Sequence, residues 1–319
     1  MHLDPALFRD DAISDETRRF NTEKTAELTA LPDSWSVPPA EIRKLRDKGL
    51  GAFPLPPRCP RATTITIDGP HGAIEIRQIL PETGTPRGVY LHIHGGGWTF
   101  GAADYQDDRL EEITRTTGAA ALSLDYRLAP EHPYPQGPDD CEAAALWLVR
   151  QSPFRDLPLV IGGESAGAHL SVVTLIRLRD KHELTPFAGA ALTAGCYDLA
   201  LTPSARNWGT EKLILTTRDI TLFARSFLGE DCDATSADIS PIRADLAGLP
   251  PALFSVGTRD ALLDDSLFMA ARWMAAGNGA EISVHPGGCH VFQAFPLEIS
   301  RKSNAEIDAF INAAFDRAS

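Results

Sequence analysis

One short stretch constrains this chain more than any other: Gly163-Glu164-Ser165-Ala166-Gly167, a G-x-S-x-G motif. It follows the apolar run 157–161 and opens a segment, residues 166–178, that has almost no polar face. A strand, a sharp turn and a buried helix are therefore predicted in succession, which is the setting in which this motif presents a reactive serine. Small residues on both sides would let neighbouring backbone approach closely. Ser165 is accordingly the candidate nucleophile.

The rest of the chain alternates between strand-like and helix-like segments. The first two strand-like segments flank Asp68-Gly69-Pro70 and are expected to pair antiparallel. Helical patterns separate the later ones, which indicates an α/β fold with a mostly parallel eight-stranded sheet flanked by helices. The strand-like segments are residues 63–68, 74–80, 89–93, 119–124, 157–161, 187–192, 252–256 and 281–285.

Two regions interrupt this alternation and are predicted to form a helical cap. Residues 1–50 are helical in pattern and end before a proline-rich crossing. Residues 199–239 form an excursion between two strands, and an excursion of this length is usually a functional insertion. The catalytic domain is then expected in two parts, residues 51–198 and 240–319. A chain of 319 residues can bury a core large enough for this arrangement.

Composition argues against several classes of function. The net charge is −13, from 43 acidic and 30 basic side chains, so a nucleic acid or an anionic membrane would be repelled. The five cysteines are scattered without a C-x-x-C pair, which indicates neither a disulfide framework nor a zinc site. A cytoplasmic protein with reduced thiols and no bound metal is expected. Neither a secretory signal nor an apolar run of membrane-spanning length is predicted.

A nucleophilic serine requires a base, and the base requires a carboxylate that orients it. After a serine on a strand–turn–helix motif, the acid follows a late strand and the histidine follows the last one. Asp260 comes after the strand at 252–256, and His290 comes after the strand at 281–285. The predicted catalytic residues are therefore Ser165, Asp260 and His290.

Other acids and histidines fit these roles less well. Asp264 and Asp265 fall where they would cap the next helix. His285 is predicted inside a strand, and His92 and His94 precede the serine, which is the wrong order for the base. Asp260 and His290 are therefore preferred.

The third feature that carries chemistry is His94-Gly95-Gly96-Gly97-Trp98, directly after the strand at 89–93. Three glycines let the backbone bend so that its N–H groups face the nucleophile, where a side chain would obstruct a substrate. Such N–H groups stabilise the oxyanion that forms during acyl transfer. The predicted oxyanion donors are Gly95, Gly96 and the residue after the nucleophile, Ala166.

Together these motifs resemble those of the hormone-sensitive-lipase-like (bacterial type IV) carboxylesterases of the α/β-hydrolase superfamily. The resemblance covers roughly residue 60 to the C-terminus. It implies a cofactor-free serine hydrolase with a helical cap, usually acting on short acyl chains and often dimeric. It also implies the same triad and oxyanion donors. The matching stretches are His94–Trp98, Asp125-Tyr126-Arg127-Leu128-Ala129-Pro130-Glu131-His132-Pro133-Tyr134-Pro135, Gly163–Gly167, Asp260-Ala261-Leu262-Leu263-Asp264-Asp265 and His290.

Several positions depart from the usual pattern of that family, including the Gly-Cys-His-Val sequence around His290. Glu164 stands where the family has aspartate, which keeps the carboxylate but lengthens its reach. Ala168 replaces a glycine and Ala261 a common proline. None of these changes removes a catalytic group, but the contact made by Glu164 beneath the nucleophile is expected to differ.

The leading hypothesis is hydrolysis of a small-molecule ester of short to medium acyl chain through an acyl-enzyme. Lactones, amides and carbamates pass through the same kind of intermediate, and an acyltransferase would differ only in the acceptor. A non-catalytic ligand-binding module on the same fold is the alternative from another class, and the presence of His290 argues against it. Candidate pocket residues are Trp35, Trp98, Tyr197, Trp208, Phe223 and Phe227. A homodimer is a further expectation from the resemblance.

Overall fold

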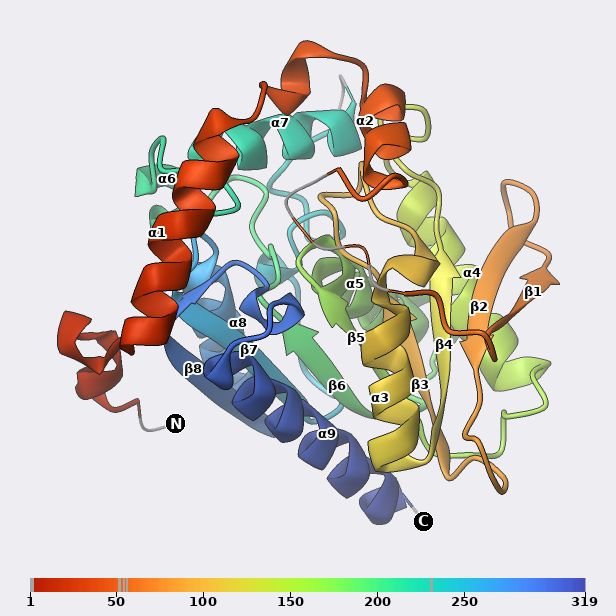
Figure 1. Ribbon diagram of the computed structural model, residues 1–319. Coiled ribbons are helices and arrows are strands. Elements are labelled where there is room, and N and C mark those ends of the chain that lie inside the picture. The colour runs from red at the N-terminus through yellow and green to blue at the C-terminus, as the bar shows by residue number, and fades with distance from the viewer. Residues whose placement is uncertain (1–2, 51–52, 54, 56, 230–231, 319) are drawn as a thin grey trace.

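The computed structural model describes residues 3–50, 53, 55, 57–229 and 232–318, and its centre is a twisted sheet (Figure 1). Eight strands in this part of the chain have the order β1-β2-β4-β3-β5-β6-β7-β8. β2 pairs antiparallel with β1 and β4, whereas all other neighbours are parallel. The α/β fold class and the antiparallel opening pair are thus confirmed. The strands are β1 Thr63–Ile67, β2 Ile74–Ile79, β3 Gly88–Ile93, β4 Ala119–Asp125, β5 Leu159–Glu164, β6 Phe187–Thr193, β7 Ala252–Arg259 and β8 Ala280–Cys289.

Helices cover both faces of the sheet. α3 and α9 pack on one face, where Tyr90 and Val160 point, while α4, α5 and α8 pack on the other, where Leu91 and Ile161 point. This alternation of neighbours between two apolar clusters explains why β3 and β5 are apolar on both faces, except at His92 and Glu164 near their carboxyl ends. The helices of these two layers are α3 Asp107–Thr117, α4 Gln136–Arg150, α5 Ala166–His182, α8 Leu263–Ala275 and α9 Glu298–Ala318.

The regions predicted as a cap contain the remaining α-helices of the described chain. α2 and α7 lie beyond the carboxyl ends of the parallel strands, and α1 extends from them down past β8 (Figure 1). The indole Nε1 of Trp35 donates to Asp219 Oδ1 at 2.8 Å, which joins two segments far apart in the sequence. Of the predicted boundaries, residues 1, 51 and 319 lie outside the described residues, as do residues 230 and 231 within the predicted segment 199–239. These helices are α1 Asp15–Ala30, α2 Pro39–Arg46, α6 Pro203–Asn207 and α7 Thr217–Leu228.

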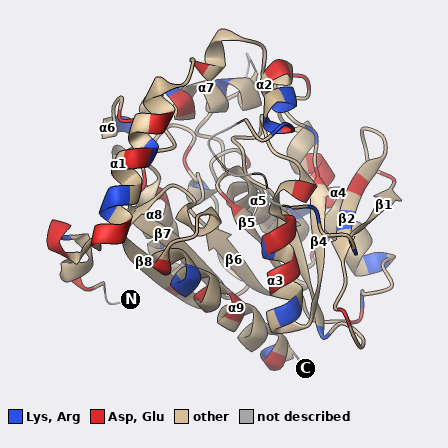
Figure 2. Cartoon of the chain, in the orientation of Figure 1, with Lys and Arg blue, Asp and Glu red and all other residues tan. Residues whose placement is uncertain are grey.

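Short 3₁₀ turns lie between several of the longer elements in the described chain. The first of them begins at Pro5, and the side chain of Asp4 accepts a hydrogen bond from the backbone N–H of Ala6. In the part of the chain that is described, no helix is long and apolar enough to cross a membrane. Acidic and basic side chains alternate along outer helices such as α1 and α3 (Figure 2). The 3₁₀ turns are Pro5–Phe8, Asp10–Ala12, Ser34–Ser36, Ala103–Gln106, Pro241–Arg243 and Phe292–Ala294.

Strand ends matter most near the site, and the end of β8 differs most from the sequence expectation. β8 extends to Cys289, four residues past the predicted end, because its last residue still pairs with Arg259 of β7. His285 lies inside this strand as predicted, buried with its Nε2 3.3 Å from Glu306 Oε2. The longer strand places His290 directly at its carboxyl end, beside the end of β7.

Candidate active site

The turn between β5 and α5 holds Ser165 in an unusual backbone conformation. Its φ is 55° and its ψ is −118°, a region that residues with a side chain rarely occupy. A Cβ atom on Gly163 would approach Ile93 O to 2.0 Å, and one on Gly167 would approach the same oxygen to 1.8 Å. Both glycines of the motif are therefore required because the end of β3 lies against the turn.

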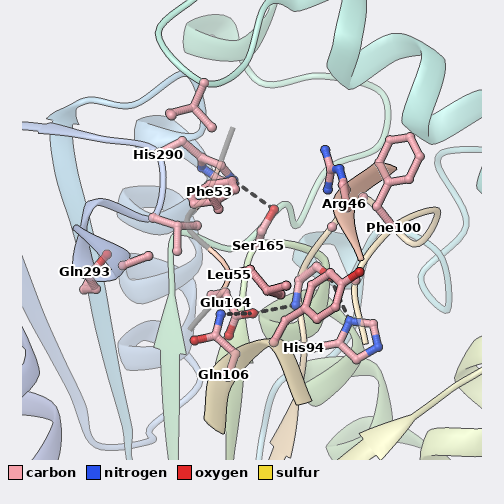
Figure 3. A pocket seen from close by; sticks show the side chains of 18 of the residues that line it. Arg46, Phe53, Leu55, His94, Phe100, Gln106, Glu164, Ser165, His290 and Gln293 are labelled. Carbon is pink, nitrogen blue, oxygen red and sulfur yellow. Dashed lines mark hydrogen bonds between the residues drawn. The ribbon is translucent and has the colours of Figure 1, made fainter. Parts of the chain in front are cut away.

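The three side chains predicted to form a triad meet in a hydrogen-bonded row. Ser165 Oγ lies 2.9 Å from His290 Nε2 (Figure 3). His290 Nδ1 lies 3.0 Å from each carboxylate oxygen of Asp260. Because a carboxylate only accepts, Nδ1–H donates to Asp260 and Nε2 accepts from the serine hydroxyl. Asp260 and His290 are 2% and 3% exposed, so bulk water does not compete for these bonds.

The acid and the base come from two neighbouring parallel strands. Asp260 follows β7 directly, and His290 follows β8 directly. The backbone N–H of Leu262 also donates to Asp260 Oδ1 at 2.9 Å, which fixes the orientation of that carboxylate. The arrangement can transfer a proton from Ser165 to His290 while Asp260 stabilises the resulting imidazolium.

The glycine loop after β3 corrects one sequence prediction. The N–H of Gly95 donates to Glu164 Oε1 at 2.6 Å, so this hydrogen is directed at a carboxylate and is not available to a substrate oxyanion. Gly96 and Gly97 have φ values of 114° and 61°, which turn the loop past the nucleophile. Among the described residues, the N–H groups of Gly96, Gly97 and Ala166 have no hydrogen-bond acceptor.

Glu164 is the centre of a buried polar network beneath the loop. Besides Gly95, it accepts a hydrogen bond from His92 Nε2 at 3.0 Å and one from Gln106 Nε2 at 3.2 Å. His92 Nδ1 in turn lies 2.8 Å from Ser123 Oγ. Burial opposes the charged form, but His92 and the N–H of Gly95 outweigh it and lower the pKa of Glu164 below its usual range. A carboxylate is therefore present under the oxyanion loop.

Residues 125–135 pack against the same loop and hold it in place, a role that the sequence did not indicate. Tyr126 donates its hydroxyl hydrogen to His94 O at 2.9 Å, and its ring stacks on the His94 ring at 4.3 Å. The N–H of Ala129 donates to Trp98 O at 2.8 Å. Asp125 Oδ1 accepts from the N–H of Ala103 at 2.7 Å. The loop is thus held at both of its ends.

A cavity of about 1930 Å³ includes Ser165 and His290 in its wall. Its lining is mainly apolar and aromatic, with side chains from α2, α7 and the loop after β3. Of the predicted pocket residues, Trp35, Trp98 and Phe223 belong to this wall. Side chains that line it and were not predicted include Arg46, Phe53, Leu55, Phe100 and Phe295.

Three predicted pocket residues lie away from the cavity wall. Tyr197 is fully buried in the core, with its ring 6.2 Å from that of Phe254. Phe227 is buried and stacks on Trp98 at 4.8 Å. Trp208 donates its Nε1–H to a backbone carbonyl at 2.9 Å within its own loop. Large aromatic side chains here fill packing gaps, which sequence cannot distinguish from contact with a substrate.

Trp98 owes its fixed position to a buried histidine. Its Nε1–H donates to His169 Nδ1 at 3.1 Å, and His169 Nε2–H donates to Ile239 O at 2.8 Å. Burial lowers the pKa of His169 to about 4, so the ring is neutral and can accept the indole hydrogen at neutral pH.

Elsewhere in the described chain, no cluster of three or more His, Cys, Asp or Glu side chains could hold a metal ion.

Comparisons with known proteins match the chain to a family of hydrolases. A family profile described as alpha/beta hydrolase fold matches residues 90–294. The chain is 35% identical to a carboxylic ester hydrolase, LipN, of Mycobacterium tuberculosis, over 76% of this chain and 68% of that protein. It is 32% identical to the esterase LipI of the same organism, over 85% of this chain and 87% of that one.

The fold comparison extends the likeness to almost the whole chain. A solved structure of an esterase from the bacterial hormone-sensitive lipase family superimposes with a TM-score of 0.81 and 29% sequence identity. The superposition covers 95% of this chain and 99% of that esterase. The likeness therefore extends over nearly the full length of both chains.

Proposed function

We propose that this chain, which belongs to the alpha/beta hydrolase fold family, hydrolyses short- to medium-chain acyl esters through an acyl-enzyme on Ser165. Within that family it is a hormone-sensitive-lipase-like carboxylesterase. The observation that carries the mechanism is the row of hydrogen bonds from Ser165 through His290 to Asp260. The aromatic cavity beside this row supports an apolar acyl chain as the bound group.

In the proposed first half-reaction, His290 removes the proton of Ser165 as its oxygen attacks the ester carbonyl. Asp260 stabilises the imidazolium, and the N–H groups of Gly96, Gly97 and Ala166 bind the oxyanion. Removing one donor of this kind typically lowers kcat by roughly 10²- to 10³-fold. The assignment of Gly97 in place of Gly95 is supported by the bond from the Gly95 N–H to Glu164.

Collapse of the tetrahedral intermediate expels the alcohol, which receives its proton from His290, and leaves the acyl group on Ser165. Water then attacks the acyl-enzyme while His290 removes its proton, and the serine departs with that proton to regenerate the site. Each half-reaction therefore returns the triad to its starting protonation state.

A series of p-nitrophenyl esters from acetyl to palmitoyl tests this function with wild type and Ser165→Ala. We expect turnover that is highest for short to medium chains, and a loss of at least roughly 10³-fold in kcat in the variant. Ser171→Ala is the matched control, because its hydroxyl only donates to Gly167 O in the same helix. Retained turnover in a folded Ser165→Ala protein would refute the assigned nucleophile.

The chain is also proposed to be a cytoplasmic homodimer. Support for the compartment comes from the cysteines, which are unpaired among the described residues. β8 ends the sheet, and an edge strand is a surface on which a second copy can add. Sedimentation velocity would show a species of twice the 34.5 kDa chain mass, whereas a monomer at micromolar concentration would contradict the dimer.

A further inference from the structure

The last residue of α2, Arg46, directs a positive charge into the cavity. Its guanidinium carbon lies 4.2 Å from the centre of the Phe100 ring, and Figure 3 shows both side chains on one side of Ser165, with His290 on the other. Two other basic side chains of the same helix have carboxylate partners: Arg43 pairs with Glu131, and Lys44 pairs with Glu41.

Arg46 differs from these neighbours because its guanidinium has no ion-pair partner among the described residues. In the part of the chain that the structure describes, no carboxylate lies within ion-pair distance of its guanidinium, and no hydrogen-bond acceptor does either. Burial lowers the pKa of Arg46 to about 10, and the electrostatic interaction with Tyr105 opposes that change. The group therefore remains cationic at neutral pH. Arg46 is partly buried, and a charge in such a position without a partner is costly, so a cation kept here points to a ligand that completes it.

The stacking on Phe100 fixes the plane of the guanidinium and leaves the N–H groups at its edge free. A planar fork of this kind matches the two oxygens of a carboxylate and can bind both at once. Because Arg46 lines the cavity that contains Ser165, the bound carboxylate would belong to the substrate.

The position of His290 indicates which part of the ester carries that carboxylate. His290 must reach the oxygen of the leaving alcohol in order to protonate it, so the alcohol departs on the His290 side of Ser165. The acyl chain then extends to the opposite side, which is where Arg46 and Phe100 lie (Figure 3).

We propose that Arg46 binds a carboxylate at the far end of the acyl chain, so that the preferred substrates are half-esters of dicarboxylic acids. This inference rests on the proposed function, because it concerns the substrate of the same site. Arg46 is then a specificity-determining residue, and it takes no part in the bond-making steps.

The test compares esters that differ only in the terminal group of the acyl chain. Monoethyl succinate, glutarate and adipate each carry a carboxylate where ethyl butyrate, valerate and hexanoate carry a methyl group, and a pH-stat follows all six. For Arg46→Met we expect kcat/KM on the preferred half-ester to fall roughly 10- to 100-fold, as for loss of a hydrogen-bonded charge, with neutral esters changed less than about threefold. Arg46→Lys should lie between wild type and Arg46→Met.

Lys44→Met is the matched control, because it removes the same charge from the same helix at an exposed position outside the cavity wall. It should leave both substrate series unchanged. Circular dichroism confirms that each variant folds. If neither Arg46 variant folds, adipate should inhibit wild-type hydrolysis of ethyl hexanoate at least tenfold more strongly than hexanoate does, and equal inhibition would overturn the inference.

Each pattern of results has one interpretation. An equal fall on charged and neutral esters, or no fall on either, would overturn the role of Arg46 while leaving the esterase function intact. Absence of turnover by wild type on all six esters would contradict the proposed function, and the inference with it. A loss confined to the half-esters supports the carboxylate site.

Discussion

At the scale of single residues, Glu164 explains how the nucleophile turn and the oxyanion loop are tied together. It occupies the second position of the G-x-S-x-G motif, next to Ser165, and its carboxylate accepts from the N–H of Gly95 and from His92. The length of a glutamate side chain lets one group reach both partners. Because Gly96 and Gly97 follow directly, the same contact sets the direction of the donors proposed for the oxyanion.

Replacing Glu164 by glutamine is predicted to lower kcat with little change in KM. The amide keeps one acceptor oxygen, which cannot serve both Gly95 and His92 as a carboxylate does. We expect kcat on p-nitrophenyl butyrate to fall roughly 10- to 100-fold, less than for removal of an oxyanion donor, with KM within about threefold. Gln106→Ala is the control, since it removes only the longest of the three contacts, at 3.2 Å. A glutamine variant with wild-type kcat would show that the loop is held by other contacts.

The triad could be predicted from the sequence because each member follows a strand that periodicity identifies. The oxyanion donors could be predicted only in part. Which N–H of the glycine run faces the nucleophile depends on the φ values of Gly96 and Gly97 and on the reach of Glu164, and neither is encoded in the motif. The sequence also could not predict that Arg46 lines the cavity, because its position depends on how α2 packs against the rest of the fold.

At the scale of elements, the first turn of α8 fastens the segment after β6 to the sheet. Asp265 is fully buried there and accepts hydrogen bonds from the backbone N–H groups of Tyr197 and Asp198 and from the hydroxyl of Thr202. Burial raises the pKa of Asp265 to about 7, although these three donors oppose the change. Its ionisation is therefore coupled to folding.

The raised pKa of Asp265 predicts a loss of stability as pH increases. Between its ordinary pKa of 3.8 and about 7, the folded state binds a proton that the unfolded state has released. The free energy of unfolding should therefore fall with rising pH in this window, by up to about 1.4 kcal/mol per pH unit from this group. Asp265→Asn should remove that contribution, so urea unfolding at pH 5 and pH 7 would show wild type losing stability relative to the variant. Parallel changes in the two proteins would contradict the coupling.

The helical character of α1, α2 and α7 could be predicted from the sequence, but the packing of these helices against one another could not. Trp35 and Asp219, which join the N-terminal region to α7, are 184 residues apart in the sequence. Phe223 and Phe227 lie one turn apart on α7, yet one lines the cavity and the other packs on Trp98. Periodicity identifies the apolar face of a helix, whereas the division of that face between core and cavity is set by packing partners.

At the scale of the whole molecule, the carboxyl ends of parallel strands concentrate the chemistry at one edge of the sheet. The ends of β3, β5, β7 and β8 supply the glycine loop, the nucleophile, the acid and the base. The order of these strands brings together groups that the chain separates widely, and this convergence is the general rule for open α/β sheets. The predicted cap helices then enclose the cavity above that edge.

The most direct test of the account is covalent trapping of Ser165 with a fluorophosphonate, followed by intact-mass measurement and peptide mapping. The account predicts one adduct per chain, on Ser165, with activity lost in proportion to labelling. His290→Ala should react much more slowly, because the serine then lacks its base. An adduct on another residue, or full labelling of Ser165→Ala, would contradict the assignment of the nucleophile and the mechanism built on it.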